Sequence, residues 1–282
     1  MTAYISGPLI TFCLLPLFAT VLIAAAIRFF GGRATNDRLV SASAGVGIVW
    51  VTVLVLGMPG FPPPLGSAAL PIILLAGLVV GSLLDQFLPV FHDRARLWDT
   101  VLDFAFAIGA IAWFRNGLDL WGMVIFVAWG TLQIQLRRYT VRNTIPAVMM
   151  LLSAGGLVLV AWTGNAPGNR DLALGVLGVT LGLSVWLFLN RSLPIGFGYL
   201  WGGFTAQLLI TLRMIESNPA LTAPIAVLGF IFYADTAAAS LAVWKPALKK
   251  VPSPLMTGVV SIFPLTLAIV IAAAVSQLAQ AG

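Results

Sequence analysis

A few carboxylate and amide side chains lie inside otherwise apolar stretches, and these are the residues of this sequence best suited to chemistry. Asp235 sits in the run Phe-Ile-Phe-Tyr-Ala-Asp-Thr, with Tyr233 and Thr236 close to it in sequence. If that run crosses a membrane, burying the carboxylate costs about 2.5 to 3.5 kcal/mol, so Asp235 should face the interior of a helix bundle and have a partner there. Two roles fit equally well: a group that binds a proton or a solute, or a protonated group that joins two helices through a hydrogen bond.

Gln133 and Gln207 are long amide side chains that also fall within apolar runs. Amides at membrane depth most often form hydrogen bonds between helices, and the alternative is that they line a polar path. Together with Asp235, Tyr233 and Thr236, these two glutamines make up a candidate site for a substrate or a proton.

A second group of ionisable residues lies between positions 85 and 103 and includes the only histidine of the chain. Its candidate members are Asp85, His92, Arg94, Arg96, Asp99 and Asp103. Asp99 and Asp103 are four residues apart, which places them on one face of a helix. We expect Asp85 and Asp103 to face each other across a short loop. The group is then either a cytoplasmic gate that exchanges protons or a set of salt bridges that holds two helix ends at the interface.

The sequence offers little from which to build a catalytic or cofactor site. With one cysteine and one histidine, it has no intramolecular disulfide, no CxxC pair, no bis-histidine haem and no Cys/His zinc cluster. It also lacks a Walker-type loop, a Gly-x-Ser-x-Gly elbow and a His-Glu-x-x-His helix. We therefore expect neither an enzyme nor a bound cofactor, and we assign no metal ligands.

The elements that must position these groups are membrane-spanning helices. Of the 282 residues, 60% are hydrophobic and 9% are charged, whereas soluble domains average about 25% charged residues. The charges fall between apolar runs of roughly 18 to 24 residues, the length that crosses about 30 Å of hydrocarbon. Ten spans are predicted, at 8–30, 39–56, 70–90, 97–114, 120–136, 145–162, 172–189, 195–215, 221–244 and 255–278.

Arginine and lysine are distributed unevenly between the loops of this topology. Loops after odd-numbered spans, with their edges, hold Arg28, Arg33, Arg38, Arg94, Arg96, Arg137, Arg138, Arg142, Arg191, Lys245, Lys249 and Lys250, whereas those after even-numbered spans hold Arg115, Arg170 and Arg213. The positive-inside rule makes the first set cytoplasmic, so both termini are expected outside the cytoplasm of a bacterial inner membrane. Since orientation also explains the net charge of +6, no nucleic-acid partner is expected.

The predicted fold is an all-α polytopic bundle of about ten transmembrane helices that forms a single domain over residues 1–282. Division at residues 1–142 and 143–282 gives five spans per half, which forces the halves into opposite orientations, as in inverted-repeat transporters. Gly77 with Gly81 and Gly178 with Gly182 have the small-residue spacing that predicts close internal packing of helices.

Two functions are compatible with this sequence. The first is a small secondary transporter or flippase for a small or amphipathic solute, with protons as a candidate coupling partner. The second is a non-catalytic scaffold or accessory subunit, whose partners besides the lipid bilayer are other membrane proteins or a second copy of the chain. Helices interrupted by proline and small residues favour transport, whereas the scarcity of polar residues favours a scaffold; the balance lies slightly towards transport.

Overall fold

A computed structural model describes residues 7–31, 37–60, 64–87, 95–137, 144–164, 167–189, 195–245 and 250–281. For residues 95–99 only the backbone is described. The described residues contain helices and no strand, as the all-α prediction requires.

The helices follow one another with short connections. The first part of the chain begins with a π-helical turn, η1 (Ile10–Leu14), which continues directly into the first long helix. Five long helices make up this part: α2 (Leu15–Phe30), α3 (Asp37–Leu56), α4 (Leu70–Phe87), α5 (Ala95–Arg115) and α6 (Leu120–Arg137). A 3-10 turn, η2 (Gly66–Ala69), precedes α4. The second part begins with α7 (Thr144–Thr163) and α8 (Pro167–Leu189) and ends with α13 (Ser253–Ala281).

Two spans of the second part are built from several pieces. One consists of α9 (Phe197–Tyr199), the π-helical turn η4 (Leu200–Phe204) and α10 (Thr205–Ser217). The other consists of the 3-10 turn η5 (Pro219–Leu221), α11 (Thr222–Gly229), the 3-10 turn η6 (Phe230–Tyr233) and α12 (Ala234–Trp244). Each of the ten predicted spans therefore corresponds to one helical segment of the structure, with ends that agree to within a few residues.

Seven of the described helical segments are long and apolar enough to cross a membrane. Leu120–Leu136 is apolar but shorter. The other two segments, α5 and α9–η4–α10, carry more polar and charged side chains, including Asp103, Gln207 and Arg213. The protein is an integral membrane protein of the all-α polytopic class.

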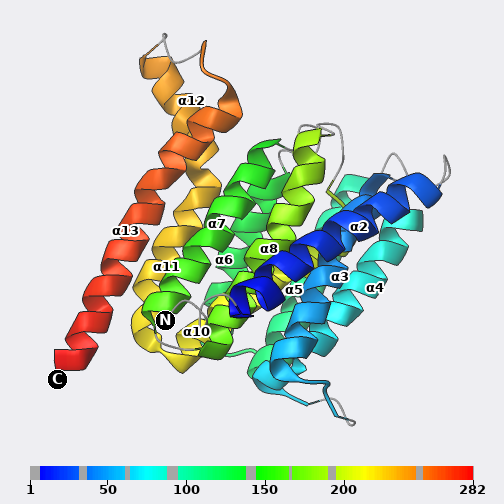
Figure 1. Cartoon of the computed structure of the whole chain (residues 1–282), viewed down its shortest axis with the longest axis horizontal. Helices are drawn as coiled ribbons and strands as arrows, with labels where there is room; N and C mark the ends of the chain where they lie inside the picture. Colours follow the sequence, from blue (N-terminus) through cyan, green and yellow to red (C-terminus); the bar gives the residue numbers. More distant parts are fainter. Residues whose placement is uncertain are drawn as a thin grey trace.

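The helices lie side by side in a tilted bundle, and its two ends carry alternate loops (Figure 1). The start of the first helical segment and the end of α13 both lie at the lower side of the view. A chain with an even number of spans begins and ends on the same side of the membrane, so the arrangement agrees with the ten-span topology. The α12–α13 hairpin extends beyond the other helices at the upper left.

The centre of the bundle is formed by α7 and α8, which pack on each other and are the most buried of the long apolar helices. Glycine permits the closest contacts, as the sequence predicts. A Cβ atom on Gly81 would lie 2.7 Å from the backbone carbonyl of Phe197, and one on Gly182 would lie 2.7 Å from the carbonyl oxygen of Leu17. Both small-residue pairs thus serve packing within the chain.

Candidate functional site

A cavity of about 320 Å³ lies between α6, α10 and the segment from α11 to η6, with α7 behind it. Its wall is largely aliphatic and aromatic, and the lining residues that the structure describes include no charged side chain. The polar members are Thr131, Ser153, Gln207, Thr211 and Tyr233. The arrangement suits a ligand that is mostly apolar and has a few hydrogen-bonding groups.

The interrupted spans position much of this wall. Phe204 ends the π-helical turn η4, and Phe230, Phe232 and Tyr233 belong to the 3-10 turn η6; all four line the cavity. A change of helix type rotates the side chains that follow, and such turns inside longer helices often occur at functional sites. Here the two turns contribute four aromatic residues to the cavity wall.

Gln207 is the amide side chain among the described lining residues of the cavity, and it is buried, with 4% of its surface exposed. Its Nε2 group donates to Ser153 Oγ on α7 at 2.6 Å, and Ser153 Oγ donates to the Met150 carbonyl oxygen at 3.0 Å. The structure therefore brings Gln207 and Tyr233, two members of the predicted substrate site, to one cavity.

Asp235 is placed elsewhere. Its Oδ1 atom accepts hydrogen bonds from Thr257 Oγ1 at 3.0 Å and Ser253 Oγ at 3.3 Å, both on α13, and it does not line the cavity. Thr236, next to it, is exposed. These two hydrogen-bond partners of Asp235 come from the neighbouring helix in the hairpin, and Tyr233 contributes to the cavity instead.

Gln133 is also separate from the cavity lining. It lies buried on α6 with 3% of its surface exposed, and its Nε2 atom has no hydrogen-bond partner among the described residues. Hence the five predicted members of the substrate site do not converge. Gln207 and Tyr233 lie at the cavity and Asp235 at the α12–α13 contact, whereas Gln133 is buried on α6 outside the lining and Thr236 is exposed.

Asp85 is fully buried and binds the start of α9. Its Oδ1 and Oδ2 atoms accept the backbone N–H groups of Phe197 and Gly198, each at 2.9 Å, while Ser41 Oγ accepts that of Gly196 at 2.9 Å. The first N–H groups of a helix have no partner within it and carry a partial positive charge, which favours a carboxylate here. Asp85 thus caps the start of α9 from α4, a contact that the sequence did not predict.

Asp103 contacts the same span one turn further along. Trp201 Nε1 donates to Asp103 Oδ1 at 2.5 Å, and the Trp201 ring stacks on Phe106 with ring centroids 4.7 Å apart. Asp85 and Asp103 therefore both bind the segment Phe197–Trp201. His92 and Arg94, together with the side chains of Arg96 and Asp99, lie outside the described residues, so the rest of the predicted cytoplasmic cluster has no structural description.

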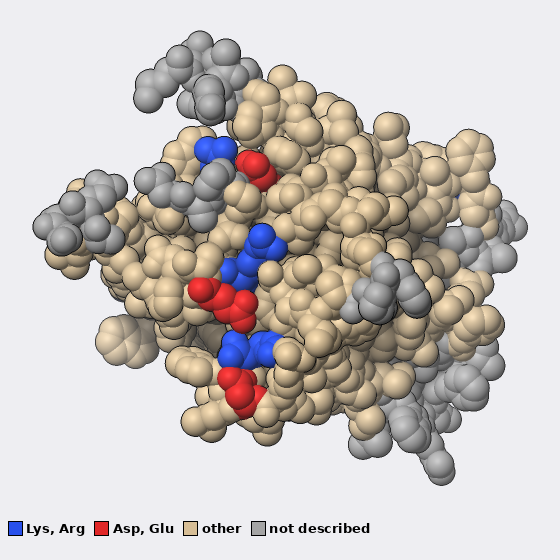
Figure 2. Space-filling model, turned by 90° about the horizontal axis from the view of Figure 1, so that it is seen from below, with Lys and Arg blue, Asp and Glu red and all other residues tan. Residues whose placement is uncertain are grey.

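The opposite end of the bundle carries a row of alternating basic and acidic side chains (Figure 2). Arg115 bridges Asp119 at 2.7 Å and Glu216 at 3.2 Å, and Arg170 lies 3.5 Å from Asp171. Arg213 Nε donates to Asn169 Oδ1 at 3.2 Å. The row joins the ends of α5 and α10 to the loop before α6 and the start of α8.

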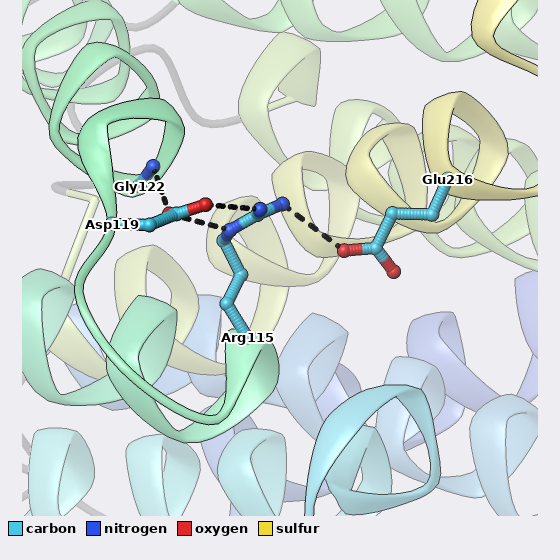
Figure 3. Close-up of polar contacts among 4 residues, drawn as sticks. All are labelled: Arg115, Asp119, Gly122 and Glu216. Carbon is cyan, nitrogen blue, oxygen red and sulfur yellow. Dashed lines mark hydrogen bonds and ion pairs between the residues drawn. The ribbon is translucent and has the colours of Figure 1, made fainter.

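Figure 3 shows the Arg115 guanidinium between the two carboxylates, with the Gly122 N–H directed at Asp119. The side-chain hydrogen bond from Arg115, aided by that N–H group, lowers the pKa of Asp119 to about 2. Because the Asp119 and Glu216 side chains are exposed, water and salt screen these pairs, so they add only a little to the link between the loop after α5 and the end of α10.

Sequence reasoning missed three polar members of the cavity wall: Thr131, Ser153 and Thr211. A signal was present, since each is a hydroxyl residue inside an apolar run. Hydroxyl groups bond readily to the carbonyl of the preceding turn, however, so they are common in membrane helices that have no binding site. Only the packing of α6, α7 and α10 shows that these three face one space.

The fold and the cavity define the class of the protein: a polytopic α-helical membrane protein with an apolar intramembrane cavity. Searches of protein-family models and of curated protein sequences found no match to the chain.

Proposed function

We propose that this protein is a small secondary transporter or flippase-like protein of a bacterial inner membrane that moves a small or amphipathic solute. The observation that supports this most strongly is the cavity of about 320 Å³ whose wall includes the interrupted span Pro219–Trp244. Discontinuous helices beside an intramembrane binding site are a recurring feature of secondary transporters.

Gln207 and Tyr233 are the residues proposed to contact the solute, because both line the cavity and carry hydrogen-bonding groups. Asp235 keeps its proposed part as a proton-coupling group. It would act through the α12–α13 contact, since Thr257 and Ser253 hold it there. A change in its protonation would alter these bonds and so the position of α12, which continues directly from the cavity-lining turn η6.

The second candidate function is a scaffold or accessory subunit. It is favoured by Asp85 and Asp103, because their bonds to Phe197, Gly198 and Trp201 have the geometry of helix-anchoring contacts. In that case the cavity has no transport role and the chain contributes surface to other membrane proteins or to a second copy of itself.

Reconstitution in liposomes distinguishes these functions. Under an imposed pH gradient, a panel of amphipathic solutes is screened for solute-dependent proton flux with the wild type, Gln207→Leu and Asp235→Asn. The transport proposal expects flux with at least one solute, a loss of uptake in Gln207→Leu, and a loss of proton movement in Asp235→Asn. Equal solute uptake by the wild type and Gln207→Leu, with both shown to be folded, contradicts a solute site at the cavity.

A further inference from the structure

Exposed residues of the cavity lining lie on the sides of α6 and of the α11–η6 segment, and in a bilayer these sides contact the lipid. On the cavity rim, Ala128 and Thr131 of α6 and Ala226 of α11 are exposed, and Phe230 of η6 has 63% of its surface exposed. The exposed side chains next to this rim on α6, Val124 and Val127, are apolar, as expected of a surface in contact with hydrocarbon. A ligand can therefore enter sideways from the bilayer, between α6 and α11.

All five of the described polar side chains of the wall contain oxygen atoms that can accept hydrogen bonds, whereas the donors that these five leave for a ligand are the Tyr233 hydroxyl and one Nε2 hydrogen of Gln207. Thr131 and Thr211 donate their hydroxyl hydrogens to the carbonyl oxygens of Ala128 and Leu208 in their own helices, at 2.7 and 2.5 Å. A hydroxyl that has donated keeps two acceptor lone pairs. These two side chains can therefore accept hydrogen bonds from a bound molecule, but they have no hydrogen left to give.

Gln207 adds a further acceptor. In the described part of the chain its one side-chain hydrogen bond is the donation from Nε2 to Ser153 Oγ. Its carbonyl oxygen can still accept up to two hydrogen bonds, and the second Nε2 hydrogen remains available as a donor. Thr211 follows Gln207 by four residues on α10, so the two lie on the same face of that helix.

The charge of the ligand follows from the same wall. None of the described residues that line the cavity is charged, so a phosphate or carboxylate placed there has no cation beside it and an amine has no carboxylate. Burying an unpaired charge is far more costly than burying a neutral group that is hydrogen-bonded. The wall thus selects a neutral molecule.

We infer that the cavity binds an uncharged amphiphile whose hydroxyl or amide group donates hydrogen bonds to Gln207 and Thr211 while its hydrocarbon chain lies between α6 and α11. This inference rests on the proposed function in taking the cavity as the solute site, and it names the solute class as neutral lipids such as monoacylglycerols or long-chain alcohols. The aromatic rings of Phe204, Phe230 and Phe232 supply the contact for the chain.

Photolabelling tests the inference directly. The full chain is placed in phosphatidylcholine nanodiscs with a trace of monoacylglycerol that carries a diazirine in its chain, and the labelled peptides are mapped by mass spectrometry. The expected label lies on the cavity-lining stretches of α6, α10 or α11. A monoalkyl phosphate of the same chain length should label these stretches at least about tenfold less, because its charge is unpaired in the cavity.

Two variants and a matched control locate the label. Ala226→Trp places a bulky ring on the rim and should abolish labelling of the cavity, whereas Ala223→Trp, at an exposed alanine of the same helix that does not line the cavity, should not. Thr211→Val keeps the shape of the half-buried side chain but removes its acceptor, and it should reduce labelling by the monoacylglycerol several-fold.

Three results would overturn the inference: equal cavity labelling by the phosphate, cavity labelling unaffected by Ala226→Trp, or label confined to lipid-facing residues, which means bulk lipid contact only. The outcome of the transport experiment is independent of the labelling result. Specific labelling without solute flux removes the transporter proposal and keeps the ligand class. If flux depends on Gln207 but occurs only with charged solutes, the transporter proposal is kept and the neutral-lipid ligand class is removed.

Discussion

Asp85 of α4 binds the backbone of Phe197 across 112 positions of the sequence, with its Oδ1 atom 2.9 Å from the Phe197 nitrogen. The second carboxylate oxygen accepts the next N–H group, that of Gly198. A side chain on one transmembrane helix thus caps the start of another, and the span that carries Gln207 begins at this contact.

Asp85→Asn is expected to lower the stability of the folded protein by about 1–3 kcal/mol, because the amide replaces one acceptor with a donor that faces a backbone N–H. Thermal unfolding in detergent measures the change. Ser41→Ala removes the single hydrogen bond to the Gly196 N–H and should have a smaller effect, near 1 kcal/mol. An Asp85→Asn variant as stable as the wild type would show that the carboxylate does not hold this helix start.

Gly81→Ala should destabilise the contact between α4 and α9 by about 1–3 kcal/mol, because the added methyl group meets the backbone of Phe197 at 2.7 Å and neither partner is a flexible side-chain end. Gly109→Ala is the matched control. Nothing lies within 4 Å of a Cβ atom at Gly109, so alanine there should stabilise α5 by about 0.5–1 kcal/mol. Thermal unfolding of both variants checks the pair, and equal effects would contradict the close approach of α4 and α9.

Hydropathy and charge distribution were sufficient to predict the fold. Each apolar run is a helix because a bilayer requires backbone hydrogen bonds to be satisfied within the segment, and that constraint acts locally along the chain. The partners of Asp85 follow from no such local constraint. They are backbone groups 112 and 113 positions away, and any of several helix starts was an equally good candidate from sequence.

The candidate site was predictable only in part for a related reason. Gln207 and Tyr233 are polar residues in apolar runs, which made them visible, but the side that a helix turns to its neighbours depends on packing. Asp235 illustrates this point, since its bonds to Thr257 and Ser253 provide polar contacts without placing it in the cavity. Because burying a carboxylate is costly, Asp235 needs hydrogen-bond partners, but those partners need not lie at the centre of the bundle.

The ion pair of Asp119 with Arg115 predicts a dependence of stability on acid. The pKa of Asp119 is lowered from 3.8 to about 2, first by the hydrogen bond from Arg115. A carboxyl group with a depressed folded-state pKa stabilises the fold above its unfolded pKa, and this contribution is lost as the pH falls towards the folded-state value. The relevant window is therefore from about pH 4 down to about pH 2.

Melting temperatures of the wild type and Asp119→Asn, measured across that window, test this dependence. The wild type should be the more stable of the two at pH 6, by a small amount since the pair is exposed, and the difference should shrink as the pH falls below 4. A difference that stays constant down to pH 2 would mean that Asp119 is not ionised in contact with Arg115.

Asp235→Asn should leave the protein folded, because the asparagine carbonyl oxygen can accept the same hydrogen bonds from Thr257 and Ser253. Asp235→Leu removes the acceptor, leaves the Ser253 hydroxyl without this partner, and should lower the melting temperature further. Size-exclusion profiles and thermal unfolding distinguish the two variants. If Asp235→Asn itself fails to fold, the carboxylate must be ionised and held by a charge, which would make it a structural ion-pair partner.

The topology gives a prediction that labelling of single cysteines can decide. Leu118, in the loop between α5 and α6, is 48% exposed, and Lys250, shortly before α13, is also exposed. In the ten-span topology the loop after α5 lies at the same end as the start of the first span and the end of the last, and Lys250 lies at the opposite end. Because the native Cys13 is buried, it should contribute little background. With the arginine- and lysine-rich loops in the cytoplasm, an impermeant maleimide should modify Leu118→Cys in intact spheroplasts and Lys250→Cys only after permeabilisation. The opposite pattern would place both termini in the cytoplasm, and the cavity rim at Ala226 would then face the inner rather than the outer leaflet.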